Sequence, residues 1–329
     1  MPILPADSPA PGDDAESVGG GIKATVGVAF VLLSALAFGS TPAFASLAFT
    51  SHISGLSLVA FRCLIAAGVL WGLSRVVRES ALGLGTGARL FALGALLFGP
   101  QMALYFAAVH RLDTSITVAV VYIYPAIVAA LTAVRLRRFP PLIEMLLLVL
   151  ALVGVGVIAL VAGDAARSTV GLLLAVSTAV IFALYVIASD VVVRDAPPIA
   201  AASLVLAGAG VSASIMARAS GQLELPQNGT AWLFLSLHGL ILAPIGVASY
   251  YAGLKRLGAT RASIVDTSQP AIAAVIGVVA LGERLTSVQI LGMIAIVFAV
   301  IGLPVAAAAR ARRRTEPARG PDVPSVCLN

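Results

Sequence analysis

Long uninterrupted runs of apolar residues dominate the pattern of this chain. They neither alternate with a period of two nor recur at amphipathic helical spacing. Each run reaches about 20 residues, the length of helix that crosses a hydrocarbon core about 30 Å thick. We therefore predict an all-α polytopic membrane protein. Its ten predicted transmembrane helices cover residues 24–43, 54–74, 88–109, 114–134, 141–162, 169–189, 197–217, 231–253, 259–280 and 286–308.

The second half of this pattern repeats the first with an offset of 145 residues. Arg111-Leu112 matches Arg256-Leu257, and Pro125-Ala126-Ile127 matches Pro270-Ala271-Ile272. Each repeat contains five predicted helices. Because five is odd, the second repeat must enter the membrane from the opposite side, so we predict two inverted five-helix repeats. Many transporters use such repeats to build a central site that opens to each face in turn.

Polar tails flank the two repeats, which occupy residues 24–162 and 169–308. Residues 1–22 contain Pro, Gly and four acidic residues, and we predict a disordered tail. Residues 309–329 are predicted to form a basic C-terminal tail. No linker is long enough to hold a separate soluble domain.

Positive charges are distributed unequally between the two sets of connecting segments. If the N-terminus is cytoplasmic, the cytoplasmic segments before residue 309 carry eleven Lys and Arg residues, and the opposite segments carry four. Cytoplasmic loops of membrane proteins are enriched in these residues. We therefore predict that both the N- and C-termini are cytoplasmic.

The composition agrees with a membrane location and argues against several functions. Hydrophobic residues make up 60% of the 329 residues and charged residues 11%, whereas soluble proteins carry about 25% charged residues. The net charge of +6 lies in loops and the C-terminal tail, where topology explains it better than nucleic-acid binding. The three histidines are scattered, and no metal constellation, phosphate loop or hydrolase motif is present. We expect no metal, no cofactor and no enzymatic activity.

Prolines recur inside predicted helices at related positions of the two repeats. Pro125 and Pro270 fall near the middle of the fourth and ninth spans, and Pro100 and Pro244 fall in the third and eighth, one residue out of register. A proline removes one backbone hydrogen bond and pushes against the carbonyl four residues earlier. The prolines therefore indicate either kinks that shape packing or hinges of a transport cycle, and their recurrence in both repeats favours hinges.

Arg62 in the second span and Asp266 in the ninth are predicted to be the most deeply placed charges. A charge inside a membrane is costly, so it should face the bundle interior and have a partner. One hypothesis is that Arg62 binds a substrate carboxylate and Asp266 binds an amine or a proton. The alternatives are a salt bridge between the two, a role as structural anchors or, for Arg62, a side chain that reaches the outer interface.

The stretch that follows Asp266 is the most polar part of any span. Asp266, Gln269 and Pro270 share one helix face at the spacing i, i+3 and i+4, and we expect this face to form one wall of a cavity. Gln101, directly after Pro100, is a further candidate for the site.

Aromatic residues supply the remaining site candidates. All six tyrosines fall within predicted spans, where rings can line a site for an amphipathic solute or form a belt at the membrane interface. Four of them lie too deep for a belt, namely Tyr105, Tyr122, Tyr124 and Tyr185, whereas Tyr250 and Tyr251 fit either role. We include Tyr105, Tyr185 and Tyr250 as site candidates.

Other features indicate helix packing rather than chemistry. His238 is a lone polar residue in the eighth span and favours a contact between helices. Small residues such as Gly154, Gly208 and Gly292 allow helices to approach closely.

On these features the chain resembles the drug/metabolite transporter superfamily, in its ten-span EamA branch, over residues 24–308. The resemblance is carried by the two Arg-Leu…Pro-Ala-Ile copies, Phe61-Arg62, the run Phe38–Pro42, and Leu281-Gly282-Glu283-Arg284-Leu285-Thr286 with Gln289 and Gly292. The first copy departs from the family pattern, because Arg137-Arg138-Phe139 stands where Gly-Glu is expected. Asp266 is not part of the general pattern either, which makes it a candidate determinant of substrate choice.

The resemblance implies transport of small metabolites, often export of amino acids or related compounds across the bacterial inner membrane. We predict an alternating-access transporter with a small-molecule substrate and the lipid bilayer as partners and with no nucleic-acid partner; a homodimer stays open. The alternatives are an importer or lipid-carrier flippase of the same fold, or a membrane scaffold or enzyme that transports nothing.

Overall fold

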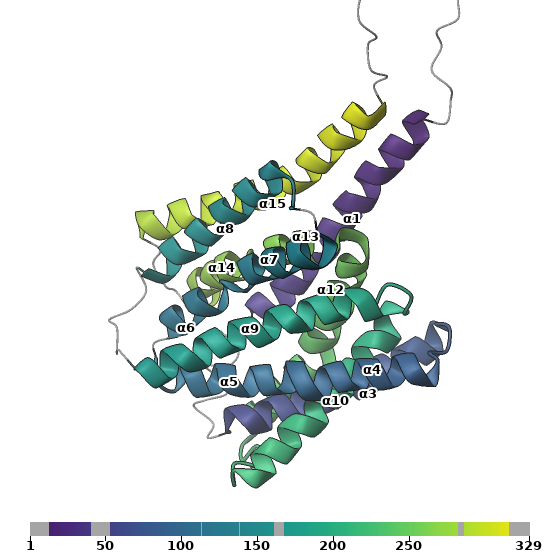
Figure 1. The fold of residues 1–329 in the computed structure, drawn as a ribbon. Coiled ribbons are helices and arrows are strands. Elements are labelled where there is room, and N and C mark those ends of the chain that lie inside the picture. Colours follow the sequence, from purple (N-terminus) through teal and green to yellow (C-terminus); the bar gives the residue numbers. More distant parts are fainter. Residues whose placement is uncertain are drawn as a thin grey trace, which may run out of the picture.

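The computed structural model describes residues 13–40, 53–112, 114–137, 139–160, 168–281 and 286–315, and all regular elements in these ranges are helical (Figure 1). In the first repeat they are α1 (Asp13–Gly39), α3 (Gly55–Val76), α4 (Leu84–Leu93), η1 (Gly94–Phe98), α5 (Gly99–Val109), α6 (Thr114–Val121), α7 (Tyr124–Leu136) and α8 (Leu142–Leu160). In the second they are α9 (Thr169–Val192), α10 (Pro198–Ala219), α11 (Gly229–Leu237), η2 (His238–Leu242), α12 (Ala243–Leu257), α13 (Ala259–Asp266), α14 (Gln269–Leu281) and α15 (Ser287–Thr315). The elements η1 and η2 are single π-helical turns.

Seven helices in the described ranges are long and apolar enough to cross a membrane. They are Ile22–Gly39, Gly55–Val76, Leu84–Val109, Thr169–Val192, Pro198–Ala219, Gly229–Leu257 and Ser287–Ala306. The predicted fourth and ninth spans are each broken into two short helices, α6 with α7 and α13 with α14. The chain is therefore a multi-pass membrane protein, and the count of ten crossings stays a prediction.

Both ends of the helical bundle differ from the predicted tails. α1 begins at Asp13, so the helix includes residues 13–22 of the predicted tail. α15 continues to Thr315, beyond the predicted end at residue 308, because its last residues are the good helix formers Ala and Arg. Residues 1–12 and 316–329 lie outside the described residues, as does the turn 282–285.

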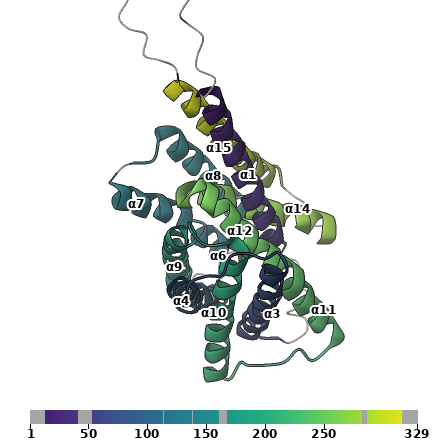
Figure 2. The same cartoon turned by 90° about the vertical axis from the view of Figure 1, so that its right-hand side faces the viewer.

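The two repeats are interlocked rather than stacked side by side. The most extensive helix contacts pair α3 with α10, α1 with α12, and α8 with α15, and each pair joins one helix of each repeat. The Asp13 end of α1 and the Thr315 end of α15 project together from the same end of the bundle (Figures 1 and 2). This arrangement agrees with an even number of crossings.

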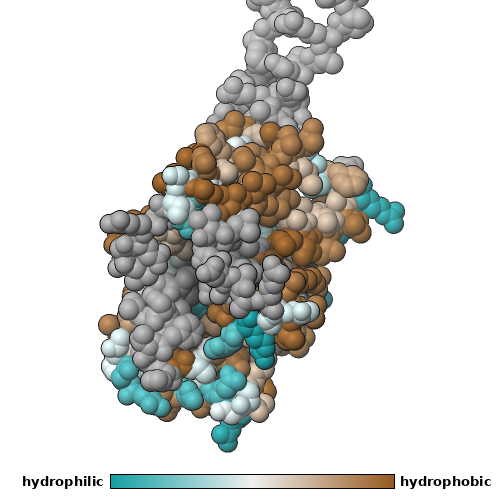
Figure 3. All heavy atoms as spheres, turned by 90° about the vertical axis from the view of Figure 1, so that its left-hand side faces the viewer, coloured by the Kyte–Doolittle hydropathy of each residue, from teal (hydrophilic) through white to brown (hydrophobic). Residues whose placement is uncertain are grey.

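The outer surface is apolar, as a lipid-facing surface should be. Brown apolar side chains cover a broad area of the face in Figure 3, and polar side chains gather toward its lower edge. Leu96, Leu173 and Phe298 are among the large exposed hydrophobic residues.

Glycines allow the closest contacts between the repeats. A Cβ atom on Gly94 would lie 1.9 Å from the carbonyl oxygen of Val205, and one on Gly208 would lie 2.1 Å from that of Phe91. On Gly154 a Cβ would lie 2.6 Å from the carbonyl oxygen of Gly292. The backbones thus touch where small residues were predicted to permit it.

We expect Gly94→Ala and Gly208→Ala to destabilise the protein strongly, since a backbone oxygen cannot move aside as a flexible side chain can. Thermal unfolding in detergent and the yield of monodisperse protein measure the effect. Gly68→Ala is the matched control, because no heavy atom lies within 4 Å of its Cβ position. It should be neutral or slightly stabilising, as Ala favours a helix interior by about 1 kcal/mol over Gly. Equal stability of all three variants would contradict the close packing.

Candidate functional site

Two helices are interrupted at matching positions of the repeats. α6 ends at Val121 and α7 begins at Tyr124, while α13 ends at Asp266 and α14 begins at Gln269. In each case the proline predicted to lie inside a helix is the second residue of a new helix, where its missing N–H costs little. The predicted kinks at Pro125 and Pro270 are thus complete breaks.

Polar side chains near the second break donate hydrogen bonds to backbone carbonyls of α13. Thr267 Oγ1 donates a hydrogen bond to the carbonyl of Ile264 at 2.6 Å, and Ser263 Oγ donates to that of Thr260 at 2.8 Å. Away from water, such partners are what makes a broken helix tolerable. The polar stretch after Asp266 therefore has a structural role as well as a chemical one.

Pro100 and Pro244 mark a different irregularity. Each is the second residue of an α-helix that directly follows a π-helical turn, at η1 and η2. The N–H of Gly99 donates to the carbonyl of Gly94, five residues back, and the N–H of Ala243 donates to that of His238. A π-turn holds one extra residue, which accommodates a proline that cannot continue the regular bonding.

Asp266 is the central polar residue of the bundle. It is 1% exposed. The hydroxyl of Tyr124 donates to Oδ2 at 2.6 Å, and Nε2 of Gln269 donates to Oδ1 at 2.6 Å. Tyr124 and Gln269 are themselves 145 residues apart. The two donors therefore occupy repeat-related positions, each directly before the proline of a helix break. They contact the carboxylate of Asp266 from two sides.

The partners of this carboxylate are neutral. In the described part of the chain, the ion pairs join Arg194 to Asp190 and Arg261 to Glu144, and none includes Asp266. The position that matches Asp266 in the first repeat is Val121, so the charge has no counterpart there. Among the described residues, the partners of Asp266 therefore carry no positive charge that would balance a carboxylate at this depth.

A small cavity lies beside Asp266. Its volume is about 30 Å³, and it is lined by Phe38, Phe98, Phe182, Tyr185, Val247, Tyr250, Asp266 and Gln269. This volume holds about two water molecules and no metabolite. The cavity must therefore widen before a solute can enter.

Aromatic rings form most of the cavity wall. Phe98 and Tyr185 have ring centroids 5.1 Å apart, and Phe182 stacks on Tyr185 at 5.8 Å. The Tyr185 hydroxyl is hydrogen-bonded to that of Tyr251 at 2.7 Å. The Tyr250 hydroxyl is buried and has no hydrogen-bond partner among the described residues. Several aromatic faces around one carboxylate suit an organic ammonium group.

The structure brings together four of the seven predicted site residues, Asp266, Gln269, Tyr185 and Tyr250. Tyr105 lies elsewhere, where its ring packs on Phe106 at 5.6 Å beside a separate apolar cluster. The position of Tyr105 in a predicted span indicated its depth in the membrane but not the direction in which its side chain points.

Arg62 and Gln101 do not line the cavity. Arg62 Nη1 lies 3.3 Å from Nε2 of His238, and Nη2 donates to the sulfur of Met102 at 3.3 Å. The alternative of a salt bridge with Asp266 is therefore wrong, because each charge has its own neutral partners. The interface alternative is wrong as well, since Arg62 is 5% exposed and turned toward neighbouring helices. His238 is the contact between helices that was predicted.

Sequence reasoning placed Tyr124 deep in a span without selecting it as a site residue, and it missed the three phenylalanines of the cavity. Tyr124 could have been found from the offset, because it occupies the position that matches Gln269. Phe38, Phe98 and Phe182 come from three separate helices, and an apolar residue in an apolar span gives no signal of its own.

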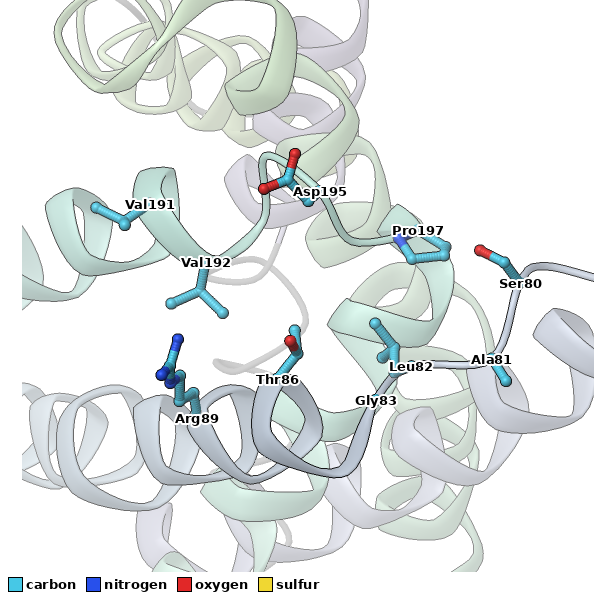
Figure 4. Close-up of a pocket in the computed structure, with 10 residues that line it drawn as sticks. All are labelled: Ser80, Ala81, Leu82, Gly83, Thr86, Arg89, Val191, Val192, Asp195 and Pro197. Carbon is cyan, nitrogen blue, oxygen red and sulfur yellow. The ribbon is translucent and has the colours of Figure 1, made fainter.

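A larger hollow lies at the surface, and none of its lining residues lines the cavity beside Asp266. Its volume is about 210 Å³, and it is lined by the α3–α4 connection, the start of α4, and the α9–α10 connection. Figure 4 shows Arg89 and Thr86 extending from α4 toward Val192. Arg89 and Asp195 are exposed. This hollow therefore lacks the buried charge that distinguishes the inner cavity.

A carboxylate beside this hollow fastens two connections together. Glu79 accepts hydrogen bonds from the backbone N–H groups of Ile199 at 3.2 Å and Ala200 at 2.8 Å. A negative group at the start of α10 satisfies helix N–H groups and favours the helix dipole. These hydrogen bonds hold the α3–α4 connection against the start of α10, and the packing of these segments shapes the hollow.

Comparisons with known proteins agree with the fold and the two repeats. The model of the EamA-like transporter family matches residues 25–160 and 169–303. A Bacillus subtilis (strain 168) protein described as "Uncharacterized transporter YwfM" is 26% identical over 300 residues, which are 89% of this chain and 98% of that protein. A crystal structure described only as that of a protein has a TM-score of 0.72 and 19% identity, and the match covers 87% of this chain and 98% of the other. This likeness shows the fold alone.

The family match covers both halves of the chain and falls within the two repeats that the offset of 145 residues defines. The relative named as a transporter matches along almost its whole length. This multi-pass membrane protein therefore belongs to the EamA-like transporter family and is a membrane transporter.

Proposed function

We propose that this transporter exports a small amine-containing metabolite, an amino acid or a related compound, across the bacterial inner membrane by alternating access. Asp266 binds the ammonium group of the substrate within the aromatic cavity. The observation that carries the proposal is the buried carboxylate, which lines the cavity and whose hydrogen-bond partners among the described residues are neutral.

The residue types of the cavity wall favour an ammonium group as the ligand. A carboxylate alone would serve a proton or a metal ion as well. The faces of Phe98, Phe182 and Tyr185 add the attraction of aromatic rings for organic cations. The unpartnered hydroxyl of Tyr250 adds one further polar contact for a bound solute.

The contacts of α13 suggest how the site changes between states. α13 carries Asp266 and belongs to the second repeat. It is tied to the first repeat by the Tyr124 hydrogen bond and by the ion pair of Arg261 with Glu144 on α8, at 2.8 Å. The bond from Gln269 stays within the second repeat. A shift between the repeats therefore breaks the Tyr124 bond and keeps the Gln269 bond, which frees Oδ2 for the substrate.

The proposed orientation has both termini in the cytoplasm. The Lys and Arg bias of the connecting segments supports it, and so does the common position of the ends of α1 and α15 (Figure 1). In this orientation the Arg261–Glu144 ion pair closes the cytoplasmic side. The direction of export rests on the family resemblance.

Asp266→Asn should lower transport at least about tenfold, because an ammonium ion loses a charge-assisted partner in a site with little water. Counterflow of labelled amino acids and amines into proteoliposomes measures it. Asp195→Asn, an exposed acid at the surface hollow, is the matched control and should transport normally. Unchanged counterflow in Asp266→Asn would remove Asp266 from the site. Absence of counterflow for all solutes in the wild type would favour the scaffold alternative.

Tyr124→Phe should lower the thermal stability of the substrate-free protein. It removes a donor from a buried carboxylate, which costs about 1.5–3 kcal/mol, and leaves the ring contact with Phe182 at 4.6 Å in place. Tyr250→Phe is the comparison variant. It removes a buried hydroxyl that has no partner in the described structure, so it should not destabilise the fold. Equal unfolding temperatures of these two variants in detergent would contradict the proposed tie between repeats.

A further inference from the structure

The surface hollow between the α3–α4 and α9–α10 connections contains charges of both signs that do not pair with each other. Arg89, on α4, belongs to the first repeat, and Asp195, on the α9–α10 connection, belongs to the second (Figure 4). Neither of the ion pairs found in the described part of the chain includes them. A guanidinium and a carboxylate that line one hollow without an ion pair can each contact a ligand that carries both charges.

The walls of the hollow are fixed in place before any ligand binds. Glu79 accepts hydrogen bonds from the N–H groups of Ile199 and Ala200, which joins the α3–α4 connection to the start of α10. The hollow is also the larger of the two cavities, with a volume of about 210 Å³ against about 30 Å³ beside Asp266. It therefore has room for a polar group of several atoms without a rearrangement of the bundle.

One wall of the hollow favours a phosphate group. Arg89 and Thr86 are three residues apart on α4, so their side chains share one helix face. A guanidinium binds two phosphate oxygens at once, and a hydroxyl donates to a third. The start of α4 supports the same ligand, because Gly83, which also lines the hollow, gives no side-chain cap to the first N–H groups of this helix.

The end of α3 places the hollow at the depth of lipid headgroups. Trp71 is 58% exposed, and the guanidinium of Arg75 lies 5.3 Å from the centre of its ring. Exposed tryptophans of membrane proteins concentrate at the interface, and arginines near helix ends reach toward it. α3 ends at Val76, and the hollow begins four residues later, at Ser80. Phospholipid headgroups are thus the polar groups that surround it.

Exposed apolar side chains flank the polar hollow. Leu84, the chain neighbour of Gly83, is 95% exposed, and Val191, which lines the hollow, is 47% exposed. A phospholipid combines these two kinds of surface, since its headgroup is polar and its acyl chains are apolar. The headgroup fits the hollow while the acyl chains stay against the apolar side chains outside it.

We propose that this hollow binds the headgroup of a zwitterionic phospholipid in which a phosphate is linked to a primary ammonium group, as in phosphatidylethanolamine. Arg89 and Thr86 bind the phosphate, and Asp195 binds the ammonium group. An anionic headgroup without an ammonium group leaves the carboxylate of Asp195 without a cation, so the hollow distinguishes the two lipid classes. Because the two charges come from different repeats, the bound lipid joins the repeats at this end of the bundle.

The proposal is independent of the transported solute, because the hollow and the cavity beside Asp266 share no lining residue. Its readout is lipid binding and not counterflow. A failure of the lipid experiment would therefore leave the proposed function unchanged, and the reverse also holds.

Thermal unfolding of the delipidated full-length protein in detergent tests the site, with dioctanoyl-phosphatidylethanolamine as the added lipid. The unfolding temperature should rise as the lipid binds the folded state. The lipid concentration that gives half of this rise should be about two- to fivefold lower than for dioctanoyl-phosphatidylglycerol, the effect of one exposed ion pair. In Asp195→Asn the two lipids should become equal.

Arg89→Met should raise the half-maximal concentration of dioctanoyl-phosphatidylethanolamine at least about fivefold, because the phosphate loses its charged donor. Arg89→Lys keeps the charge without the planar fork and should give an intermediate value, which distinguishes loss of binding from misfolding. Arg218→Met is the matched control, since Arg218 is an exposed arginine in the last turn of α10, at the other end of that helix. It should respond to the lipid as the wild type does.

Three results would overturn the proposal. The absence of a rise with any lipid, or an unchanged rise in Arg89→Met, would remove the site. Equal half-maximal concentrations for both lipids in the wild type would remove the role of Asp195 and the zwitterionic class with it. An equal rise with free phosphoethanolamine at the same concentration would identify a soluble phosphoamine as the ligand in place of a membrane lipid.

Discussion

The cost of burying a carboxylate in an apolar bundle governs the centre of this protein. Asp266 is tolerated because two strong neutral donors meet it, one from each repeat. Those donors can reach it only because α6–α7 and α13–α14 are interrupted side by side, directly before their prolines. The breaks in turn require polar side chains such as Thr267 to satisfy freed carbonyls. The irregular backbone and the buried charge therefore support each other.

The interlocked repeats hold this centre in place. α3, α1 and α8 each pack on a helix of the other repeat, and glycines bring backbone against backbone in these contacts. Contacts of this kind permit sliding or tilting of whole helices and resist local distortion. In the proposed transport cycle, movement between the repeats would therefore be concentrated where the helices are already irregular, at the two breaks and the two π-helical turns.

The sequence was sufficient to predict the all-helical fold class, the repeat and the presence of helix discontinuities. It did not show whether each discontinuity is a break or a π-helical turn. Four prolines predicted weak points, but only the structure separates breaks at Pro125 and Pro270 from π-turns at Pro100 and Pro244. The predicted proximity of Asp266 and Gln269 was correct although no continuous helix joins them, because the short turn between α13 and α14 keeps them close.

Contacts between distant helices could not be read from the chain. An apolar run fixes the approximate depth of a residue in the membrane but not its direction around the helix axis. That is why Tyr105 faced away from the cavity while Phe182 faced it, and why Arg62 and Asp266 have separate partners. Residues placed by local turns, such as those at the breaks, were more accessible to sequence reasoning than residues placed by packing.

The pairing of Asp266 with Val121 at repeat-related positions has an energetic consequence. If exchanging the conformations of two identical repeats turned the inward-open state into the outward-open state, the two states would have equal free energy. A single charge on one repeat removes that equality, since its desolvation and its donors differ between the states. In an alternating-access cycle the empty transporter would then have a preferred resting state, and Asp266 would contribute to that preference because the matching position in the first repeat, Val121, carries no charge.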